Sequence, residues 1–297
     1  MEDFDLLLAD RLGAIRDFIT KHGEENFYLS FSGGKDSTAL SHMLDEALPN
    51  NRIPRVYLDT GIEYQAVKEF VQEQAKNDDR FIIIKPSKPI RQMLEKEGYP
   101  FKSKEHSCKL NMYQQGSTAK TLLKYKDESS KFSCPQCLKY QFQKDFRLKV
   151  SDHCCYELKK YPAKAYEKES GRHIAILGLR AGEQGQRRNH EGCIAYAKDG
   201  KTIAKFKPLN PTTEEFTLWY IKKRNITLCK LYYPPYNLKR TGCKGCPYAI
   251  DLQEELTMMG KYLPNERKQC EIIWKPVYDE YRRIGYRLTK EEQLKLF

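Results

Sequence analysis

Two spacings of apolar residues follow each other along the first hundred residues. Asp5–Lys21 carries apolar side chains at helical spacing, and three short apolar runs come after it, each succeeded by another stretch with helical spacing. The runs are Asn26–Phe31, Arg55–Leu58 and Phe81–Ile84, and the helical stretches are Thr38–Leu48, Gln65–Gln74 and Ile90–Lys96. Strands that alternate with helices predict an α/β fold, a parallel sheet with helices on both faces. The uninterrupted run Phe81–Ile84 is typical of a strand that is buried on both faces.

The regular pattern fades between 102 and 152, a stretch rich in Lys, Ser and Gln, and then returns. It predicts a helix over Cys155–Glu169, a strand over His173–Leu177, a hairpin turning at Asp199-Gly200, a helix ending at Lys223, and a helical end over Asp251–Arg283 that breaks at Pro264. We therefore predict an α/β domain built from 1–101 and 153–249, a cysteine-containing insertion at 102–152, and a helical C-terminal segment at 250–297.

Composition and charge indicate what kind of protein this is and which partners it would bind. Of the 297 residues 40% are hydrophobic and 31% charged, which is typical of a soluble globular chain. No run of about 18 apolar residues is present to span a membrane, and the acidic start Met1–Asp5 does not resemble a signal peptide, so we expect a cytoplasmic protein. The net charge of +12 favours anionic partners, namely nucleotides or nucleic acid such as DNA or tRNA. Because Lys and Arg are spread along the chain, a solvated basic surface fits equally well, and a homo-oligomer is left open.

The first predicted strand leads into Ser32-Gly33-Gly34-Lys35-Asp36-Ser37. Two glycines let the backbone turn sharply, so that successive N–H groups point into one concavity at the positive end of the following helix. Such a loop binds phosphate or sulfate, and Lys35, Ser32 and Ser37 add a charge and hydroxyl donors. It lacks the G-x-x-x-x-G-K-[ST] spacing of a Walker loop.

Two further segments follow predicted strands, where ligands of open α/β sheets bind. Asp59-Thr60-Gly61 follows the second strand; its carboxylate can hydrogen-bond a ribose or hold Mg²⁺, and Gly61 allows close approach of a ligand. Gly178 follows the strand at His173–Leu177 and begins a segment with Arg180, Glu183 and Arg187. We expect Gly178 to make room for a ligand, the arginines to bind its oxyanions, and Glu183 to orient an arginine.

The ten cysteines include two pairs that together offer four thiolates. The pairs are Cys154-Cys155 and Cys243-x-x-Cys246. Four thiolates suffice for a [4Fe–4S] cluster, with a structural Zn²⁺ as the alternative. A further Cys134-Pro-Gln-Cys137, with Cys108, His106 or Cys193 as a partner, predicts a possible second metal site that would hold another Zn²⁺.

The motifs together resemble a known family. Ser32–Ser37 resembles the PP-loop of the adenine nucleotide alpha-hydrolase superfamily, and Asp59–Gly61 matches an element of sulfonucleotide reductases. The segment Gly178–Arg187 is similar to the Gly-x-Arg-x-x-Glu-Ser-x-x-Arg element of the phosphoadenylyl-sulfate reductase family, with glutamine in place of serine. Cys154–Lys160 and Lys239–Pro247 resemble the two cluster-binding segments of iron–sulfur adenylyl-sulfate reductases.

This resemblance covers Asn26 to Ala249 and implies a Rossmann-like fold that binds ATP, adenylyl sulfate (APS) or phosphoadenylyl sulfate (PAPS). Family reductases carry a nucleophilic cysteine in a C-terminal Glu-Cys-Gly-Leu-His segment, which these 297 residues do not contain; Cys270 is expected to be a buried structural thiol.

Three functions follow from the resemblance. The first choice is ATP-dependent sulfur transfer or nucleic-acid modification with Mg²⁺ and an iron–sulfur cluster, as in the DNA-phosphorothioation enzymes of this family. The alternatives are an APS or PAPS reductase that releases sulfite, and a non-enzymatic sensor of nucleotide and cluster.

Overall fold

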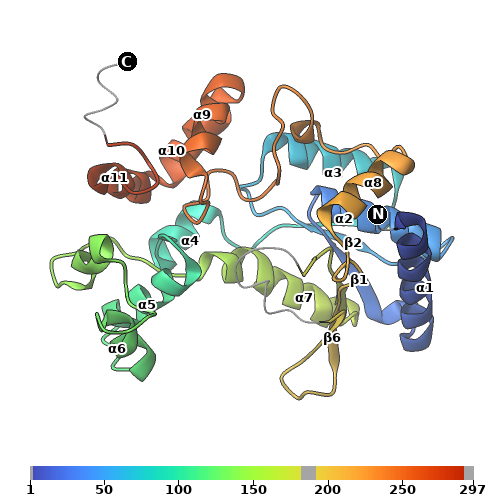
Figure 1. Ribbon diagram of the computed structural model, residues 1–297, viewed down its shortest axis with the longest axis horizontal. Coiled ribbons are helices and arrows are strands. Elements are labelled where there is room, and N and C mark those ends of the chain that lie inside the picture. The colour runs from blue at the N-terminus through green and yellow to red at the C-terminus, as the bar shows by residue number, and fades with distance from the viewer. Residues whose placement is uncertain (1–2, 182–191, 291–297) are drawn as a thin grey trace. The chain divides into compact units, whose positions relative to one another are not determined.

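The computed structural model describes residues 3–181 and 192–290, and the chain forms two compact units (Figure 1). The first unit consists of Met1–Asp59, Glu63–Lys85 and Pro162–Thr241. The second consists of Thr60–Ile62, Pro86–Tyr161 and Gly242–Phe297, so the predicted insertion and the predicted C-terminal segment fall in the same unit.

The first unit contains a mostly parallel sheet. Within the described residues its strands are β1 (Phe27–Phe31), β2 (Arg55–Leu58), β3 (Phe81–Ile84), β4 (Ile174–Ile176), β5 (Ile194–Tyr196) and β6 (Ile203–Phe206), in the order β3-β2-β1-β4-β6-β5. Only the β5–β6 pair is antiparallel, and it is the predicted hairpin. The chain leaves β1 toward β2 on one side, whereas β4 pairs on the other, which places the reversal of strand order between β1 and β4.

Helices cover both faces of this sheet, as predicted (Figure 1). They are α1 (Phe4–His22), α2 (Lys35–Ala47), α3 (Gln65–Asn77), α7 (Tyr161–Ser170) and α8 (Glu214–Lys223). Because side chains of a strand alternate between its faces, Phe27 packs against Phe18 of α1 while Tyr28 packs against Tyr166 of α7. The Tyr28 hydroxyl also donates a hydrogen bond to Glu167 at 2.8 Å.

Two local expectations are corrected by the structure. Phe81–Ile84 was expected to be buried on both faces, but β3 lies at the edge of the sheet, and Ile83 is 38% exposed. An apolar run alone does not distinguish an edge strand from a central one. Helix α2 begins at Lys35, three residues before the predicted start, because Gly34 is its N-cap. Lys35, Asp36 and Ser37 therefore form the first helical turn.

The second unit is mainly helical. Its helices are α4 (Ile90–Glu97), α5 (Lys104–Gln114), α6 (Lys120–Lys126), α9 (Leu252–Tyr262), α10 (Pro264–Ile273) and α11 (Lys275–Ile284). Short 3₁₀ and π turns add Gln136–Phe142 and Tyr156–Lys160. The predicted break at Pro264 is confirmed, since Pro264 is the first residue of α10. None of the described helices of the chain is long and apolar enough to cross a membrane.

Candidate functional site

The loop between β1 and α2 has the geometry expected of an anion-binding turn. Gly33 has a φ of +70°, and a Cβ atom there would lie 2.8 Å from Cγ1 of Val67, so both backbone and space require glycine. The Ser37 hydroxyl accepts from the Ser32 N–H at 3.2 Å and donates to the Gly34 carbonyl at 2.9 Å. These bonds fix the turn, and they leave the N–H groups of the first turn of α2 at the end of the β1 strand.

Lys35 is the central cation of this loop. Its side chain is almost fully buried, and its ammonium donates to the Glu214 carboxylate and to the Lys239 carbonyl, the latter at 2.8 Å. Lys35 also holds the pKa of the Glu214 carboxyl below its usual value. The backbone N–H of Lys35 donates to the Tyr232 hydroxyl at 3.0 Å. Protein oxygens therefore occupy the donors with which this lysine would bind a phosphate or sulfate.

The segment after β4 lies against the same loop. An added Cβ at Gly178 would lie 3.0 Å from the Asp36 carbonyl carbon, so this glycine makes room for the first turn of α2. That Gly178 also makes room for a ligand stays a prediction. Arg180 donates from Nε to Asp36 at 3.0 Å, and its Nη2 lies 4.0 Å from a Glu214 oxygen. Arg180, Asp36, Lys35 and Glu214 therefore form one charged group at the carboxyl ends of β1 and β4. Glu183 and Arg187 lie outside the described residues.

The Asp59-Thr60-Gly61 segment follows β2 as predicted. The Asp59 carboxylate pairs with Lys68 of α3 at 2.7 Å, with little of either side chain exposed. Gly61 has a φ of +83°, and a Cβ atom added there would meet no heavy atom of the described residues within 4 Å beyond its chain neighbours. Backbone conformation alone therefore requires this glycine. Asp59 belongs to the first compact unit and Thr60–Ile62 to the second.

Sequence reasoning did not identify three contributors to the loop's surroundings. Tyr232 accepts from the Lys35 N–H and contacts the Thr241 hydroxyl at 2.9 Å, and Thr241 lies close to Gly34. The third is Glu214, the first residue of α8. No local pattern marks these side chains, because only the fold brings positions 214, 232 and 241 to residues 34–36.

The four cysteines of the two pairs lie in the second unit. Cys154 and Cys155 directly precede the π-helical turn Tyr156–Lys160, a helix irregularity that is frequent at functional sites. Burial raises the pKa of the Cys154 thiol, and negative charge on Cys155, Cys243 and Cys246 raises it further. Lys159 lowers this pKa. The two pairs are therefore close enough to act on each other electrostatically.

The C-terminal helices hold the turn between Cys243 and Pro247. Trp274, between α10 and α11, donates to the Lys244 carbonyl at 3.3 Å, and the Tyr281 hydroxyl of α11 donates to the Pro247 carbonyl at 2.8 Å. The Tyr278 hydroxyl donates to the Gly245 carbonyl. Gly245 has a φ of +57°, and a Cβ atom there would lie 2.9 Å from Sγ of Cys270. Aromatic side chains spaced along this helical end thus fix three successive parts of the turn.

The thiols of the described residues are not assembled into a metal-binding group. Within residues 3–181 and 192–290 no group of three or more His, Cys, Asp or Glu side chains is placed to hold a metal ion. Their chemistry nevertheless fits a thiolate-bound centre. The buried Tyr248 hydroxyl makes no hydrogen bond of normal geometry with the described residues. Burial raises the pKa of Tyr248, the Ser107 hydroxyl lowers it, and Cys155, Cys246 and Cys154 raise it. The Tyr248 hydroxyl therefore lies beside these sulfurs and near the Ser107 hydroxyl.

The residues of the predicted second metal site are only partly associated. Burial raises the pKa of Cys134 to about 11, and Cys137 is among the groups that act on it. The charges that act on Cys108 are instead those of Asp152, Lys109 and Glu105. His106 is fully buried; its ring nitrogens contact the Tyr125 hydroxyl at 3.0 Å and the Gln141 oxygen at 2.7 Å. Its nitrogens are thus engaged in hydrogen bonds, and the second site stays a prediction.

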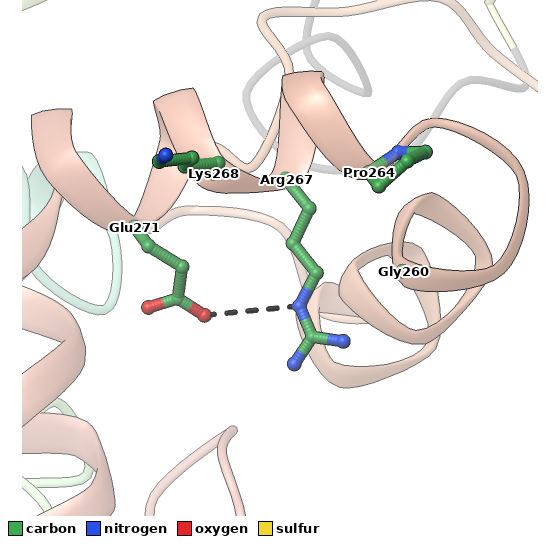
Figure 2. Close-up of a pocket in the computed structure, with 5 residues that line it drawn as sticks. All are labelled: Gly260, Pro264, Arg267, Lys268 and Glu271. Carbon is green, nitrogen blue, oxygen red and sulfur yellow. Dashed lines mark ion pairs between the residues drawn. The ribbon is translucent and has the colours of Figure 1, made fainter.

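A separate pocket of about 430 Å³ lies beside α9 and α10. It is lined by Gly260, Pro264, Arg267, Lys268 and Glu271 (Figure 2). Figure 2 shows the Arg267 guanidinium directed toward the Glu271 carboxylate, with 3.9 Å between Nε and the nearer oxygen. None of these five residues belongs to the loop or to the cysteine pairs, so the pocket is not the predicted site.

A parallel sheet with a Gly-Gly-Lys turn at its switch point, a buried lysine and a converging arginine defines a Rossmann-like PP-loop nucleotide-binding domain. The phosphoadenosine phosphosulfate reductase domain matches residues 26–249. The chain belongs to that family.

Individual relatives are more distant. The chain is 34% identical over 73 residues to an uncharacterised protein of Methanocaldococcus jannaschii, a match that covers 25% of this chain and only 17% of that protein. A phosphoadenylyl-sulfate reductase from Candida auris, in its phosphate complex, superposes with a TM-score of 0.43 at 16% identity, over 73% of this chain and 81% of that one. An NH3-dependent NAD synthetase from Campylobacter jejuni superposes with a TM-score of 0.41 at 12% identity, over 96% of this chain and 97% of that one.

Proposed function

We propose that this chain binds ATP at the PP-loop and uses it to activate an acceptor for sulfur transfer, with a nucleic acid as the acceptor. In such a reaction an acceptor oxygen attacks the α-phosphorus, the bond to the β-phosphate breaks, and pyrophosphate leaves. Lys35 and the N–H groups of the first turn of α2 would bind the phosphates of the leaving group. Mg²⁺, when bound, neutralises charge on those phosphates, and its candidate ligands are the carboxylates of Asp36, Asp59 and Glu214.

The same donors would bind the sulfate of APS or PAPS, so the loop alone does not decide the reaction. The observation that favours ATP is the packing of Cys270. A reductase of this type needs an accessible thiolate that attacks the sulfate sulfur. Cys270 is fully buried, and burial raises the pKa of its thiol to about 12. The sequence predicts a buried thiol at this position; Cys270 packs against Gly245 of the Cys243–Pro247 turn and is unsuited to attack a substrate.

Four cysteines would hold a [4Fe–4S] cluster, or Zn²⁺ as the alternative: Cys154, Cys155, Cys243 and Cys246. A bound cluster supplies redox capacity and positive electrostatics. The protein's part is to present the thiolates, and the hydrogen bonds from Trp274, Tyr278 and Tyr281 hold one pair in place for it.

A direct comparison of two products tests the proposal. Anaerobically purified protein is incubated either with ATP, Mg²⁺ and an oligonucleotide, or with APS and a dithiol reductant. We expect pyrophosphate in the first reaction, little sulfite in the second, and unchanged products for the Cys270→Ala variant. The Lys35→Ala variant is the negative control.

Sulfite release that depends on Cys270 would show that the protein is a reductase, which is the second candidate because of the family match. Nucleotide binding with no product in either reaction would instead favour the sensor function.

A further inference from the structure

The stretch 102–149 of the second unit is locally basic. This stretch has eleven Lys and Arg residues and only four acidic ones, whereas the whole chain has a net charge of +12. Basic residues occur throughout the sequence, and because acidic residues are scarce here this part of the second unit carries a net positive charge. A local excess of this kind attracts polyanions.

An exposed face of α6 and the turn after it holds four of these cations, with Asp127 and Glu128 exposed in the same turn. Lys120 and Lys124 lie one helical turn apart on α6, and Leu122 and Tyr125 are buried on the opposite side. The backbone returns to the helix because the Cys134 N–H donates to the Tyr125 carbonyl at 2.7 Å. Other members of this surface are Leu123, Lys126, Lys131 and Phe132.

An aromatic ring lies among the cations. Phe132 is 67% exposed, and the Lys124 ammonium lies 5.5 Å from the centre of its ring. Leu123, 56% exposed, adds a second apolar side chain. Removing such a ring from water is favourable, and the face of a nucleobase stacks well on it.

The lysines of this surface are available to a partner. Among the described residues, none of Lys120, Lys124, Lys126 and Lys131 forms an ion pair with a carboxylate, although Lys139 nearby pairs with Glu128. Lysine is depleted at protein–protein interfaces, while protein–nucleic acid interfaces are strongly positive. Lysines without carboxylate partners around an exposed aromatic ring therefore favour nucleic acid over a protein partner.

We propose that the surface formed by Lys120, Lys124, Lys131 and Phe132 binds a nucleic-acid strand, with the lysines on its phosphates and Phe132 stacked on an unpaired base. This inference names the nucleic-acid partner of the function proposed above. It rests on that function for the reason why the protein would bind a strand. The binding itself requires neither ATP nor a metal centre, so each can fail without the other.

Fluorescence anisotropy with labelled single-stranded DNA, single-stranded RNA and duplex DNA, at several salt concentrations and without nucleotide, tests the surface. We expect the triple variant Lys120→Glu, Lys124→Glu and Lys131→Glu to bind single strands at least tenfold more weakly. The slope of its log affinity against log salt concentration should correspond to about two fewer phosphate contacts. The control is Lys168→Glu, Lys198→Glu and Lys222→Glu, exposed lysines of the first unit, which makes the same change in net charge.

A second variant tests the ring. Phe132→Ala should weaken binding of single strands about tenfold and change duplex binding little. Comparing the affinities for single-stranded DNA and single-stranded RNA shows which of the two nucleic acids the surface prefers. Equal losses for the triple variant and its control would overturn the proposal, as would an unchanged affinity of Phe132→Ala. Binding to anionic phospholipid vesicles, with none to oligonucleotides, would overturn it too and assign the surface to a membrane. A thermal unfolding measurement on each variant shows that it is folded.

Discussion

At the scale of single residues, the main result is that the PP-loop lysine is bound by the protein itself. Lys35 gives its ammonium to Glu214 and the Lys239 carbonyl, and its backbone N–H to Tyr232. A ligand oxyanion has to replace these oxygens. The affinity of the site therefore depends on the difference between two sets of hydrogen bonds rather than on the ligand's bonds alone.

Removing the charge or the hydroxyl of the loop tests its role. We expect Lys35→Ala and Ser37→Ala to weaken binding of adenine nucleotides at least tenfold, because each removes an interaction of about 1.5–3 kcal/mol. Isothermal titration calorimetry measures the affinity, and Lys222→Ala, an exposed lysine of the same unit, is the control. Folded variants with wild-type affinity would exclude nucleotide binding by this loop.

Removing the Tyr232 hydroxyl should strengthen nucleotide binding. Tyr232→Phe frees the Lys35 N–H from its protein acceptor, so we expect nucleotide to bind about three- to tenfold more tightly, corresponding to one neutral hydrogen bond of about 0.5–1.5 kcal/mol. Tyr233→Phe is the matched control, since the Tyr233 hydroxyl accepts instead from the Leu228 N–H. A loss of affinity in Tyr232→Phe would mean that this hydroxyl contacts the ligand rather than competes with it.

At the scale of elements, the C-terminal helices explain how a short cysteine-containing turn is given a fixed shape. The Cys243-x-x-Cys246 turn has no regular structure of its own, and its carbonyl groups would be left unsatisfied without partners. Helices α10 and α11 supply those partners, and Lys244 is held by Glu266 at 2.9 Å and Gln269 at 2.7 Å. The helices therefore belong to the thiol site structurally, although they lie beyond the matched family domain.

Two glycines of this region form a matched pair for a test. Gly245→Ala places a side chain at a left-handed φ and against Tyr278 and Cys270, so we expect a loss of about 2 kcal/mol or more in the free energy of unfolding of this unit. Gly242→Ala would bring its new Cβ within 4 Å of no described heavy atom beyond its neighbours and should change stability by less than about 0.5 kcal/mol. Urea unfolding compares them. Equal stability of the two variants would show that the helices do not hold the turn.

At the scale of the whole molecule, the chain's two chemical sites lie in different compact units. The PP-loop belongs to the first unit, and both cysteine pairs belong to the second. The family domain, 26–249, includes segments of both. Each unit is assembled from three separate stretches of chain, so neither corresponds to a continuous piece of sequence.

This separation predicts how metal removal acts. Anaerobically purified protein is expected to be brown, to absorb near ~400 nm and to contain about four irons, because four thiolates are available. Cys243→Ser should abolish the metal while leaving nucleotide affinity within about twofold, since the PP-loop lies in the other unit. Metal analysis and calorimetry on the same sample measure both. Colourless protein with stoichiometric zinc from an iron-replete culture would favour the structural Zn²⁺ alternative.

The sequence alone determined the α/β fold and the position of the loop, because both depend on local patterns. Apolar runs that alternate with stretches of helical spacing predict a parallel sheet. The Gly33-Gly34-Lys35 sequence between them predicts a sharp turn from a strand into a helix. The break at Pro264 and the Asp199-Gly200 hairpin also follow from single residues whose backbone preferences are strong.

Only the tertiary structure decided which side chains surround those motifs. Phe81–Ile84 is as apolar as a central strand, and only strand order shows that it lies at an edge. Likewise Glu214, Tyr232 and Thr241 reach the PP-loop from positions about two hundred residues away, and Trp274, Tyr278 and Tyr281 reach the cysteine turn from the C-terminal helices. Contacts between distant segments depend on how elements pack together, which a local pattern does not encode.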